Sequence, residues 1–337
     1  MSASNYQSNP NVLAPAIDKN IFNDICRVFE IQSTVYNEKS MALYICNELD
    51  ILKIPYSIDD YGNIIVTKGK SILYPCFCSH LDTVHIYKNG FNLLCFKDGG
   101  HTYLHANDNN KKAVGVGGDD KAGIYACLYL LKNIDNIKVV FFSQEEVGGI
   151  GSSNINTDFF NDCQFLCSID RWNGHDFVSK YSGEETTSKT FKKAISPLLT
   201  KYDYSHNSGM FTDCFNVMQR GINISCFNIS CGYYSHHSSD EYLDMNELYN
   251  CCLFCADLCE LPERYKFKYN KKQYSLSKYW NDRELATKRG LDYDYLDYKN
   301  IPCCEYCGIE LIQGEEKYCY ECKRYIDSAI TKDELWN

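Results

Sequence analysis

Residues that can bind metal ions or move protons stand at the ends of several apolar segments. The stretch "FFSQEEVGG" places Glu145 and Glu146 side by side directly after the apolar run "IKVVFF". Further acids and histidines follow other apolar segments, in "CSHLDTV", "GGDDKAG", "SIDRWNG" and "SHHSSDE". Two adjacent carboxylates near a core repel each other, so a positively charged partner would explain why both are there.

Imidazole and carboxylate groups together suit zinc, or another borderline divalent ion, better than calcium or magnesium. The residues concerned are His80, Asp82, Asp119, Asp120, Glu145, Glu146, Asp170, His236 and His237. A carboxylate that bridges two ions about 3.5 to 4 Å apart is typical of a two-metal hydrolase site. One glutamate of the pair can then bind metal while the other acts as general base toward water. Taken singly, each residue also fits a structural role, such as a helix N-cap or a solvated turn.

Helical and extended segments alternate along the chain. Helical spacing occurs in "NIFNDICRVFEIQ", "EKSMALYICNELDIL" and "KAGIYACLYLLKNI", and in the later part of "SDEYLDMNELYNCCLFCADLCEL". Strands are predicted in "YSIDDYGNIIVTKG", around a central turn, and in "ILYPCFCSH", "IKVVFF", "CQFLCSIDR" and "INISCFNIS". This alternation predicts an α/β fold, three-layer αβα with a mixed, largely parallel sheet. Ligand sites of such sheets lie at the carboxyl ends of the strands.

The composition is that of a globular protein with one large domain and a small additional module. The chain has 337 residues, of which 45% are hydrophobic and 23% charged. A net charge of -10 gives no reason to expect binding to nucleic acid or to an anionic membrane, and no apolar run approaches the roughly 20 residues of a membrane-spanning helix. The 20 cysteines are spread through apolar segments, and the N-terminus does not resemble a signal peptide. We therefore expect reduced cysteines and a cytoplasmic location.

The C-terminal region contains two C-x-x-C pairs, which predict a zinc-ribbon-like module. The four thiolates are Cys304, Cys307, Cys319 and Cys322, and they would bind one structural zinc ion. A module this small depends on its metal for folding. Its acids outnumber its basic residues, which does not favour nucleic acid, and a protein partner stays open. We predict a flexible arm at 1–20, a catalytic domain at 21–263, a charged connector at 264–300, the ribbon at 301–325 and a tail at 326–337.

After "DDYGNIIV", five motifs follow along the chain in the order H-x-D, D-D-K-x-G, E-E, D and H-S-x-x-E. This order resembles that of the di-zinc exopeptidase superfamily, which includes peptidase T and the zinc aminopeptidases. The resemblance covers roughly residues 20 to 260. It implies that the metal ligands are His80, Asp119, Glu146, Asp170 and His237. It further implies that Asp119 bridges the two ions, that Glu145 is the general base, and that Asp82 orients His80. A cis peptide bond between Asp119 and Asp120 is also implied.

The function implied by this resemblance is hydrolysis of an amide bond in small peptides by a water molecule that two Zn²⁺ (or Co²⁺ or Mn²⁺) ions activate. An exopeptidase, either an aminopeptidase or a di- or tripeptidase, is the leading interpretation. An N-acyl amino acid deacylase is one alternative, and a catalytically silent, metal-stabilised binding protein that acts through its zinc ribbon is another. The short separation of the ligands leaves no room for an inserted lid domain. The substrate-binding residues stay open, with His206 as a candidate for stabilising the oxyanion and Asp213 as a candidate pocket residue.

Overall fold

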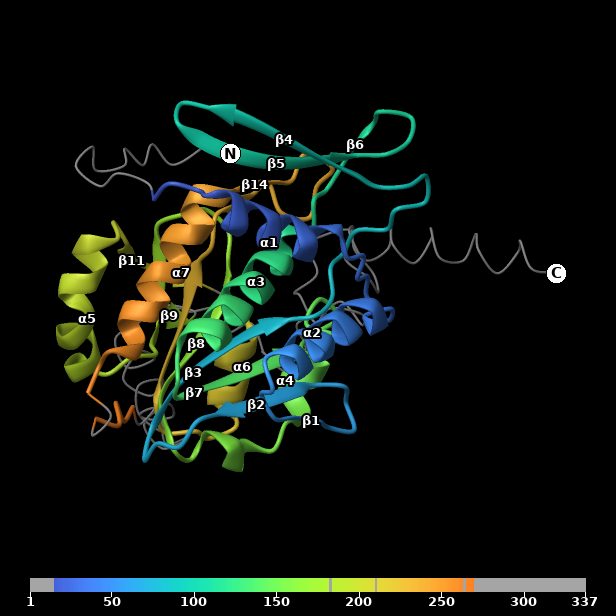
Figure 1. Cartoon of the computed structure of the whole chain (residues 1–337). Coiled ribbons are helices and arrows are strands. Elements are labelled where there is room, and N and C mark those ends of the chain that lie inside the picture. Colours follow the sequence, from blue (N-terminus) through green and yellow to red (C-terminus); the bar gives the residue numbers. More distant parts are fainter. Residues whose placement is uncertain (1–14, 182–183, 210, 263–264, 270–337) are drawn as a thin grey trace, which may run out of the picture. The chain divides into compact units, whose positions relative to one another are not determined.

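The computed structural model describes residues 15–181, 184–209, 211–262 and 265–269 (Figure 1). The first 14 residues of the predicted arm lie outside this range. So do most of the connector, the tail and the zinc-ribbon cysteines Cys304, Cys307, Cys319 and Cys322. Within the described part of the chain, no helix is long and apolar enough to cross a membrane. The cysteines found there are free, and most are buried, as their apolar surroundings in the sequence indicate.

A mixed sheet of nine strands forms the centre of the molecule, in the order β1-β2-β7-β3-β8-β12-β9-β10, with β11 paired to β9. Its strands are β1 (Tyr56–Ile58), β2 (Ile64–Lys68), β3 (Tyr74–His80), β7 (Ile137–Phe142), β8 (Cys163–Arg171), β9 (Asp176–Tyr181), β10 (Glu184–Glu185), β11 (Ser205–Gly209) and β12 (Ser225–Ser230). The four central strands β7, β3, β8 and β12 run parallel, while β1, β2, β9 and β10 pair antiparallel. The predicted mixed, largely parallel sheet is confirmed in this central part.

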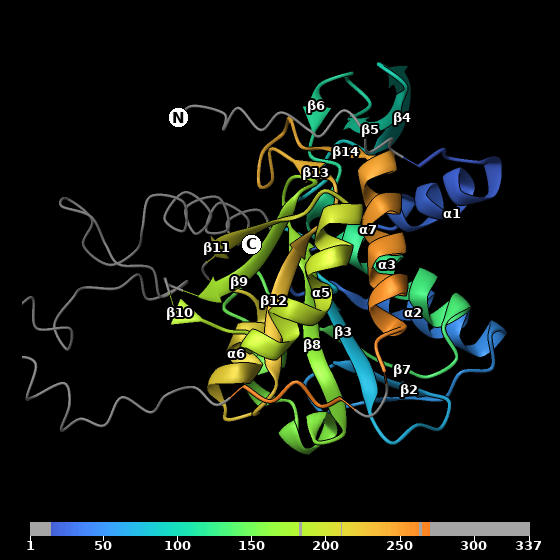
Figure 2. The ribbon, with the colours of Figure 1, turned by 90° about the vertical axis from the view of Figure 1, so that its left-hand side faces the viewer.

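Helices cover both faces of the sheet because its central strands are apolar on both sides. In β7, Val139 and Phe141 contribute to one core, and Val140 and Phe142 to the other. The first core packs against α1 (Lys19–Glu30), α2 (Lys39–Ile51), α3 (Gly118–Asn133), α5 (Lys189–Lys201) and α7 (Met245–Cys259). The second packs against α4 (Ile150–Asn154), a 3-10 turn at Thr157–Phe160, and α6 (Asp213–Gln219). Figure 2 shows α6 and α7 on either side of the sheet.

A small antiparallel sheet lies at the top of the molecule in Figures 1 and 2. It contains β13 (Tyr233–Tyr234), β14 (Tyr242–Asp244), β5 (His101–Asn107) and β4 (Asn92–Asp98) in that order, with β6 (Ala113–Val114) paired to β5. The inner face of β5 is buried through Thr102, Leu104 and Ala106. None of these strands was predicted from the sequence.

The folded unit also continues past residue 263, the limit expected from the sequence. Phe267 is 5% exposed, its N–H donates to the Gln164 carbonyl oxygen, and its own carbonyl oxygen accepts from the Ser225 N–H. The segment 265–269 therefore packs against the folded unit, beyond the limit expected from the sequence.

Candidate metal and catalytic site

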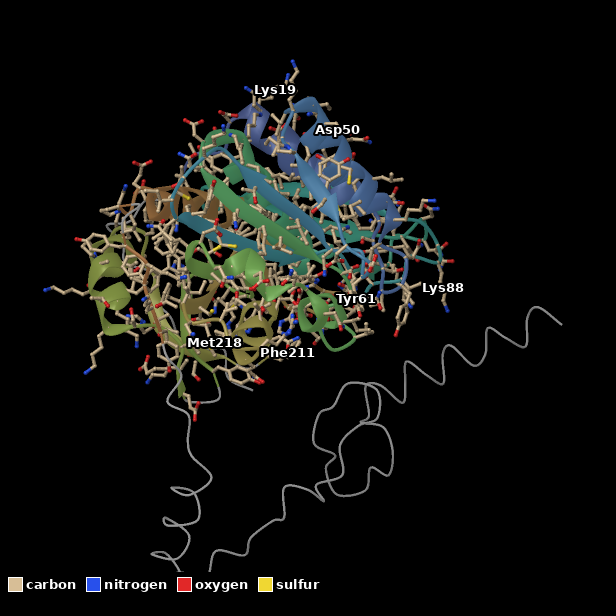
Figure 3. All side chains as sticks on the ribbon, turned by 90° about the horizontal axis from the view of Figure 1, so that it is seen from below. Lys19, Asp50, Tyr61, Lys88, Phe211 and Met218 are labelled. Atoms are coloured by element: carbon tan, nitrogen blue, oxygen red, sulfur yellow. The ribbon has the colours of Figure 1, made fainter. Side chains whose placement is uncertain are left out.

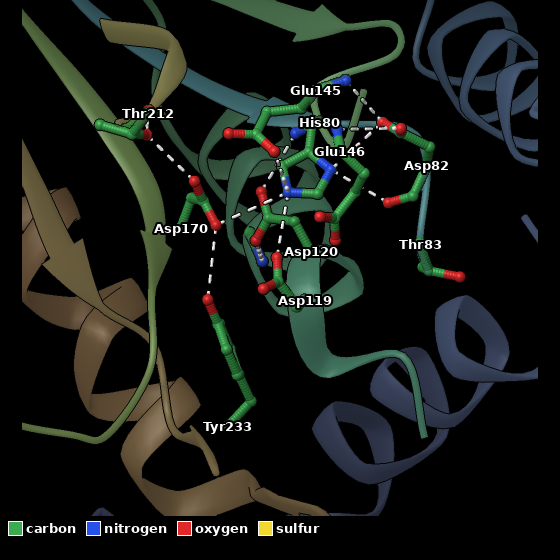
Figure 4. A network of polar contacts seen from close by, with 12 residues as sticks. His80, Asp82, Thr83, Asp119, Asp120, Glu145, Glu146, Asp170, Thr212 and Tyr233 are labelled. Carbon is green, nitrogen blue, oxygen red and sulfur yellow. Dashed lines mark hydrogen bonds and ion pairs between the residues drawn. The ribbon is translucent and has the colours of Figure 1, made fainter. Parts of the chain in front are cut away.

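His80 and most of the acids singled out in the sequence converge near the carboxyl ends of the parallel strands (Figure 4). His80 is the last residue of β3, and Asp170 lies near the end of β8. Glu145 and Glu146 follow β7, which ends at Phe142. Asp119 lies at the start of α3, and His237 lies in the loop between β13 and β14. Segments far apart in the sequence thus supply one cluster, as parallel strand ends do in this class of fold.

Asp119 lies between the two histidines. One carboxylate oxygen, Oδ1, is 3.0 Å from His80 Nε2, and the other, Oδ2, is 3.3 Å from His237 Nε2. The peptide bond that joins Asp119 to Asp120 is cis, as the family resemblance implies. Because its two oxygens face different imidazoles, Asp119 has the geometry of a bridging carboxylate.

The remaining carboxylates divide between the two histidines. Asp170 Oδ1 is 3.6 Å from His80 Nε2, while Glu146 Oε1 is 3.1 Å from His237 Nε2. Glu145 Oε2 is 4.0 Å from His80 Nε2, farther than the nearest oxygens of Asp119 and Asp170. Ligand atoms of His80, Asp119 and Glu146 lie within 4.8 Å of one another and could hold a metal ion. Asp119 thus contacts both histidines, whereas Asp170 lies beside His80 and Glu146 lies beside His237.

Asp120 and His236, the neighbours of two candidate ligands, have other contacts. Ligand atoms of Asp120, His80 and Asp170 also lie within 4.8 Å of one another. However, the two oxygens of Asp120 accept the backbone N–H groups of His80 and Gly123, at 3.1 and 3.0 Å. These bonds favour a structural role for Asp120. His236 stacks on Trp172, with ring centroids 6.0 Å apart, so the structure brings His237 to the cluster instead.

The loop that carries both glutamates is held by its own backbone N–H groups. Beyond β7 the chain turns at Gln144, which has a positive φ of 53°, so the two glutamates do not continue the strand. The carboxylate of Asp82 then accepts both following N–H groups, that of Glu145 at 3.0 Å and that of Glu146 at 3.1 Å. The Gln144 N–H donates to Glu38 Oε1 at 3.0 Å. These contacts fix the direction in which the two glutamate side chains leave the backbone.

Asp82 therefore does more than the orientation of His80 expected from the sequence. His80 Nδ1 is 3.0 Å from the main-chain oxygen of Asp82 and 3.4 Å from its carboxylate. The main chain of Asp82 thus orients the imidazole, while its side chain positions the glutamate loop. Asp82 is fully buried, so these bonds are shielded from water.

The "DDYGN" stretch supports the same loop from the opposite side. Asn63 Oδ1 accepts the Ser143 N–H at 3.1 Å, and Asn63 Nδ2 donates to the Gly151 carbonyl oxygen. Asp59 holds Asn63 in place by accepting its backbone and side-chain N–H groups. A Cβ on Gly151 would lie 2.2 Å from Asn63 Oδ1, so only glycine leaves room for this amide. The motif therefore acts on the site through the backbone.

Glu241 is a second positioning residue that the sequence analysis did not single out, although it ends the H-S-x-x-E stretch. It is 1% exposed. Its Oε2 accepts from the Gly117 N–H at 2.6 Å and lies 2.7 Å from His85 Nε2. Its Oε1 accepts from the Asp119 N–H at 3.2 Å. Glu241 thus ties the segment that carries His237 to the segment that carries Asp119.

The electrostatics of the cluster favour bound cations. Burial raises the pKa of Glu145 well above its ordinary value. Burial, together with the negative charge of Asp119, raises the pKa of Glu146 to about 7. Burial acts in the same direction on Asp119, but hydrogen bonds from His237 and His80 outweigh it and hold the pKa of Asp119 below its ordinary value. Neighbouring carboxylates that raise one another's pKa are stabilised in their ionised form by divalent cations.

The two candidate substrate residues lie in different surroundings. Asp213 is 1% exposed at the N-terminus of α6, and its Oδ1 has no hydrogen-bond partner among the described residues. The neighbouring Thr212 donates a hydrogen bond to Asp170, which places Asp213 close to the cluster. His206 is exposed on β11 and contacts Ser179 at 3.1 Å. The structure therefore associates Asp213, rather than His206, with the cluster.

Comparison with known proteins gives structural relatives only. No protein-family model and no curated protein matches the sequence. The structure is similar to that of aminopeptidase PepT from Bacillus cereus, with a TM-score of 0.58 and 14% identity over 71% of this chain and 97% of that one. A tripeptidase from Staphylococcus aureus gives a TM-score of 0.59 and 14% identity over 74% and 100% of the two chains. The TET1 peptidase of Pyrococcus horikoshii gives a TM-score of 0.53 and 15% identity over 71% of this chain and 99% of that one. The chain therefore has the fold of these peptidases.

Proposed function

We propose that this protein is a metal-dependent exopeptidase that hydrolyses an amide bond of small peptides with the help of two Zn²⁺ ions, or of Co²⁺ or Mn²⁺ in their place. The observation that carries the proposal is the position of Asp119 between His80 and His237, with a further carboxylate beside each histidine. Two imidazoles and three carboxylates are a donor set that suits zinc. His80, Asp119 and Asp170 would hold one ion, and His237, Asp119 and Glu146 the other. A structural Zn²⁺ bound by the C-terminal cysteines stays a prediction.

Two ions held by these residues would lower the pKa of water toward neutrality and polarise the scissile carbonyl. Glu145 is the general base in this proposal. It accepts a proton from the attacking water and delivers it to the leaving amine. Burial raises the pKa of Glu145 above its ordinary value, which makes it a stronger proton acceptor than an exposed carboxylate. Asp82 keeps Glu145 in place by accepting its backbone N–H.

The test is hydrolysis of a panel of free peptides, aminoacyl amides and N-acyl amino acids by the full chain, with zinc and with chelator. We expect cleavage of free peptides from one end, loss of this activity in chelator and its recovery when zinc is restored. Cleavage of N-acyl amino acids alone would identify a deacylase instead. No chelator-sensitive hydrolysis of any substrate would contradict the proposal and favour a binding protein.

A further inference from the structure

Phe211 is a large apolar side chain that stays half exposed beside the proposed metal cluster. It is 47% exposed, and Figure 3 shows it at the surface of the molecule seen from below. The next residue, Thr212, is buried, and its hydroxyl donates a hydrogen bond to Asp170 Oδ2 at 3.0 Å. A hydrogen bond to a candidate metal ligand therefore fixes the backbone that carries Phe211.

The ring of Phe211 packs against the loop that carries Glu145 and Glu146. Its outermost atom, Cζ, lies so close to Gly149 that a Cβ added there would be 2.5 Å away. The N–H of Gly149 donates to the Glu145 carbonyl oxygen at 2.9 Å, and Gly149 is buried although it belongs to a loop. The ring thus covers the end of the glutamate loop, against a residue that is hydrogen-bonded to Glu145.

These two contacts place Phe211 at the side of the cluster that Glu145 and Asp170 form. Both acids approach the same imidazole nitrogen, Nε2 of His80, with carboxylate oxygens at 4.0 and 3.6 Å. Their side chains are 11% and 10% exposed, so a ligand can reach them from solvent. Phe211 is joined to each acid by contacts through a single intervening residue. A peptide whose scissile bond lies at Glu145 would therefore have the exposed part of the ring beside it.

We propose that Phe211 determines specificity, because its exposed ring forms an apolar subsite for the side chain of a substrate residue that flanks the scissile bond. The inference rests on the proposed peptidase function, and it names the substrates as short peptides with a large apolar residue at that position. Covering the ring with such a side chain removes apolar surface of both partners from water, which favours binding. The residue lies on either the amino or the carboxyl side of the bond, and the experiment separates the two.

The test compares alanine tripeptides in which the first, second or third residue is replaced by either leucine or asparagine. Leucine and asparagine have nearly the same shape and differ mainly in polarity. We expect kcat/KM to be about fivefold higher for leucine at one position flanking the cleaved bond, because one ring covers only part of the side chain. The products identify the cleaved bond, and hence the side on which the preference lies.

The preference for leucine should disappear in Phe211→Ala. It should also disappear in Phe211→Gln, whose longer side chain can still cover Gly149 but is polar. Both variants should keep the wild-type zinc affinity and the wild-type kcat/KM on the asparagine peptides. Phe96→Ala is the matched control, because Phe96 is also 47% exposed but lies on β4, where its ring stacks on Tyr103. It should keep the full preference.

Peptide binding to the Glu145→Ala variant, measured by calorimetry with zinc present, separates this proposal from the peptidase function and should also favour leucine. Tighter binding of leucine peptides without chelator-sensitive hydrolysis by the wild type would contradict the peptidase function and leave the subsite standing. Equal kcat/KM and equal affinity for leucine and asparagine peptides would overturn the subsite. So would a preference that survives both Phe211 variants, or an equal loss of activity on both kinds of peptide, because the ring would then act only on the position of the loop.

Discussion

Replacing Asp82 by alanine tests whether the glutamate loop is held by a single buried carboxylate. The variant removes the acceptor of two N–H hydrogen bonds, from Glu145 at 3.0 Å and from Glu146 at 3.1 Å. A hydrogen bond to a charged group contributes about 1.5 to 3 kcal/mol, so losing both should cost about 3 to 6 kcal/mol if no water replaces the carboxylate. Asp82→Asn keeps one acceptor oxygen and should lose about half as much.

The catalytic consequence should exceed what the loss of stability alone would produce. A freed loop lets both glutamate side chains move, so zinc affinity should fall about 10- to 100-fold, as it does when groups that orient metal ligands are removed. The measurements are urea unfolding of the zinc-free protein, zinc affinity by competition with a chelator, and kcat/KM on the best peptide at saturating zinc.

The matched control is Asp98→Ala, which removes an exposed carboxylate at the end of the β4 strand. It should leave all three quantities unchanged. If Asp82→Ala retains zinc affinity and kcat/KM within twofold of the wild type, the carboxylate does not position the glutamates, and the reasoning is refuted.

Three further predictions concern the other loop contacts. Asn63→Ala leaves the buried Ser143 N–H without its acceptor and should lower the free energy of unfolding by about 1 to 3 kcal/mol in urea. Glu241→Gln places an amide donor against N–H groups, so zinc affinity, measured by chelator competition, should fall about tenfold. Burial raises the pKa of Glu38 from 4.5 to about 7, so the folded state binds this proton more tightly than the unfolded state. The zinc-free protein should therefore lose stability as the pH rises from 4.5 to 7. Glu38→Gln should lose less over this range, because glutamine does not titrate, while its side-chain oxygen can still accept the Gln144 N–H. Wild-type stability of Asn63→Ala, wild-type zinc affinity of Glu241→Gln, or an unchanged pH dependence of stability in Glu38→Gln would each contradict the role given to that residue.

The sequence predicts the central sheet well because its strands are buried on both faces. The run "IKVVFF" is almost wholly apolar, and "CQFLCSIDR" is buried over most of its length although it carries polar residues on one side. The two runs correspond closely to β7 and β8. The β4–β5 hairpin was missed because β4 is largely exposed and its composition is mixed, although Gly99 and Gly100, both with positive φ, mark its turn. The stretch that follows β8 also lacks clear periodicity, which hid β9 and α5.

The sequence predicts the residue types of the candidate site, but not the residues whose hydrogen bonds hold them in position. His80, Asp119 and Glu146 stand at strand ends or helix starts, where the fold class alone brings them together. Their hydrogen-bonded supports come from elsewhere in the chain. Glu38 reaches a loop 106 residues away in the sequence, and Glu241 reaches one 122 residues away. Such contacts depend on how loops pack, and no local pattern of polar residues specifies them.

The most direct test of the central claim compares zinc content and peptide hydrolysis in the wild type and in Glu145→Ala. If Glu145 moves the proton while the other acids and the histidines hold the metal, the variant should bind as much zinc per chain as the wild type. It should also lose at least a hundredfold in kcat, in the range that general-base catalysis contributes. A Glu145→Ala variant that hydrolyses peptides at the wild-type rate with the same zinc content would contradict the account.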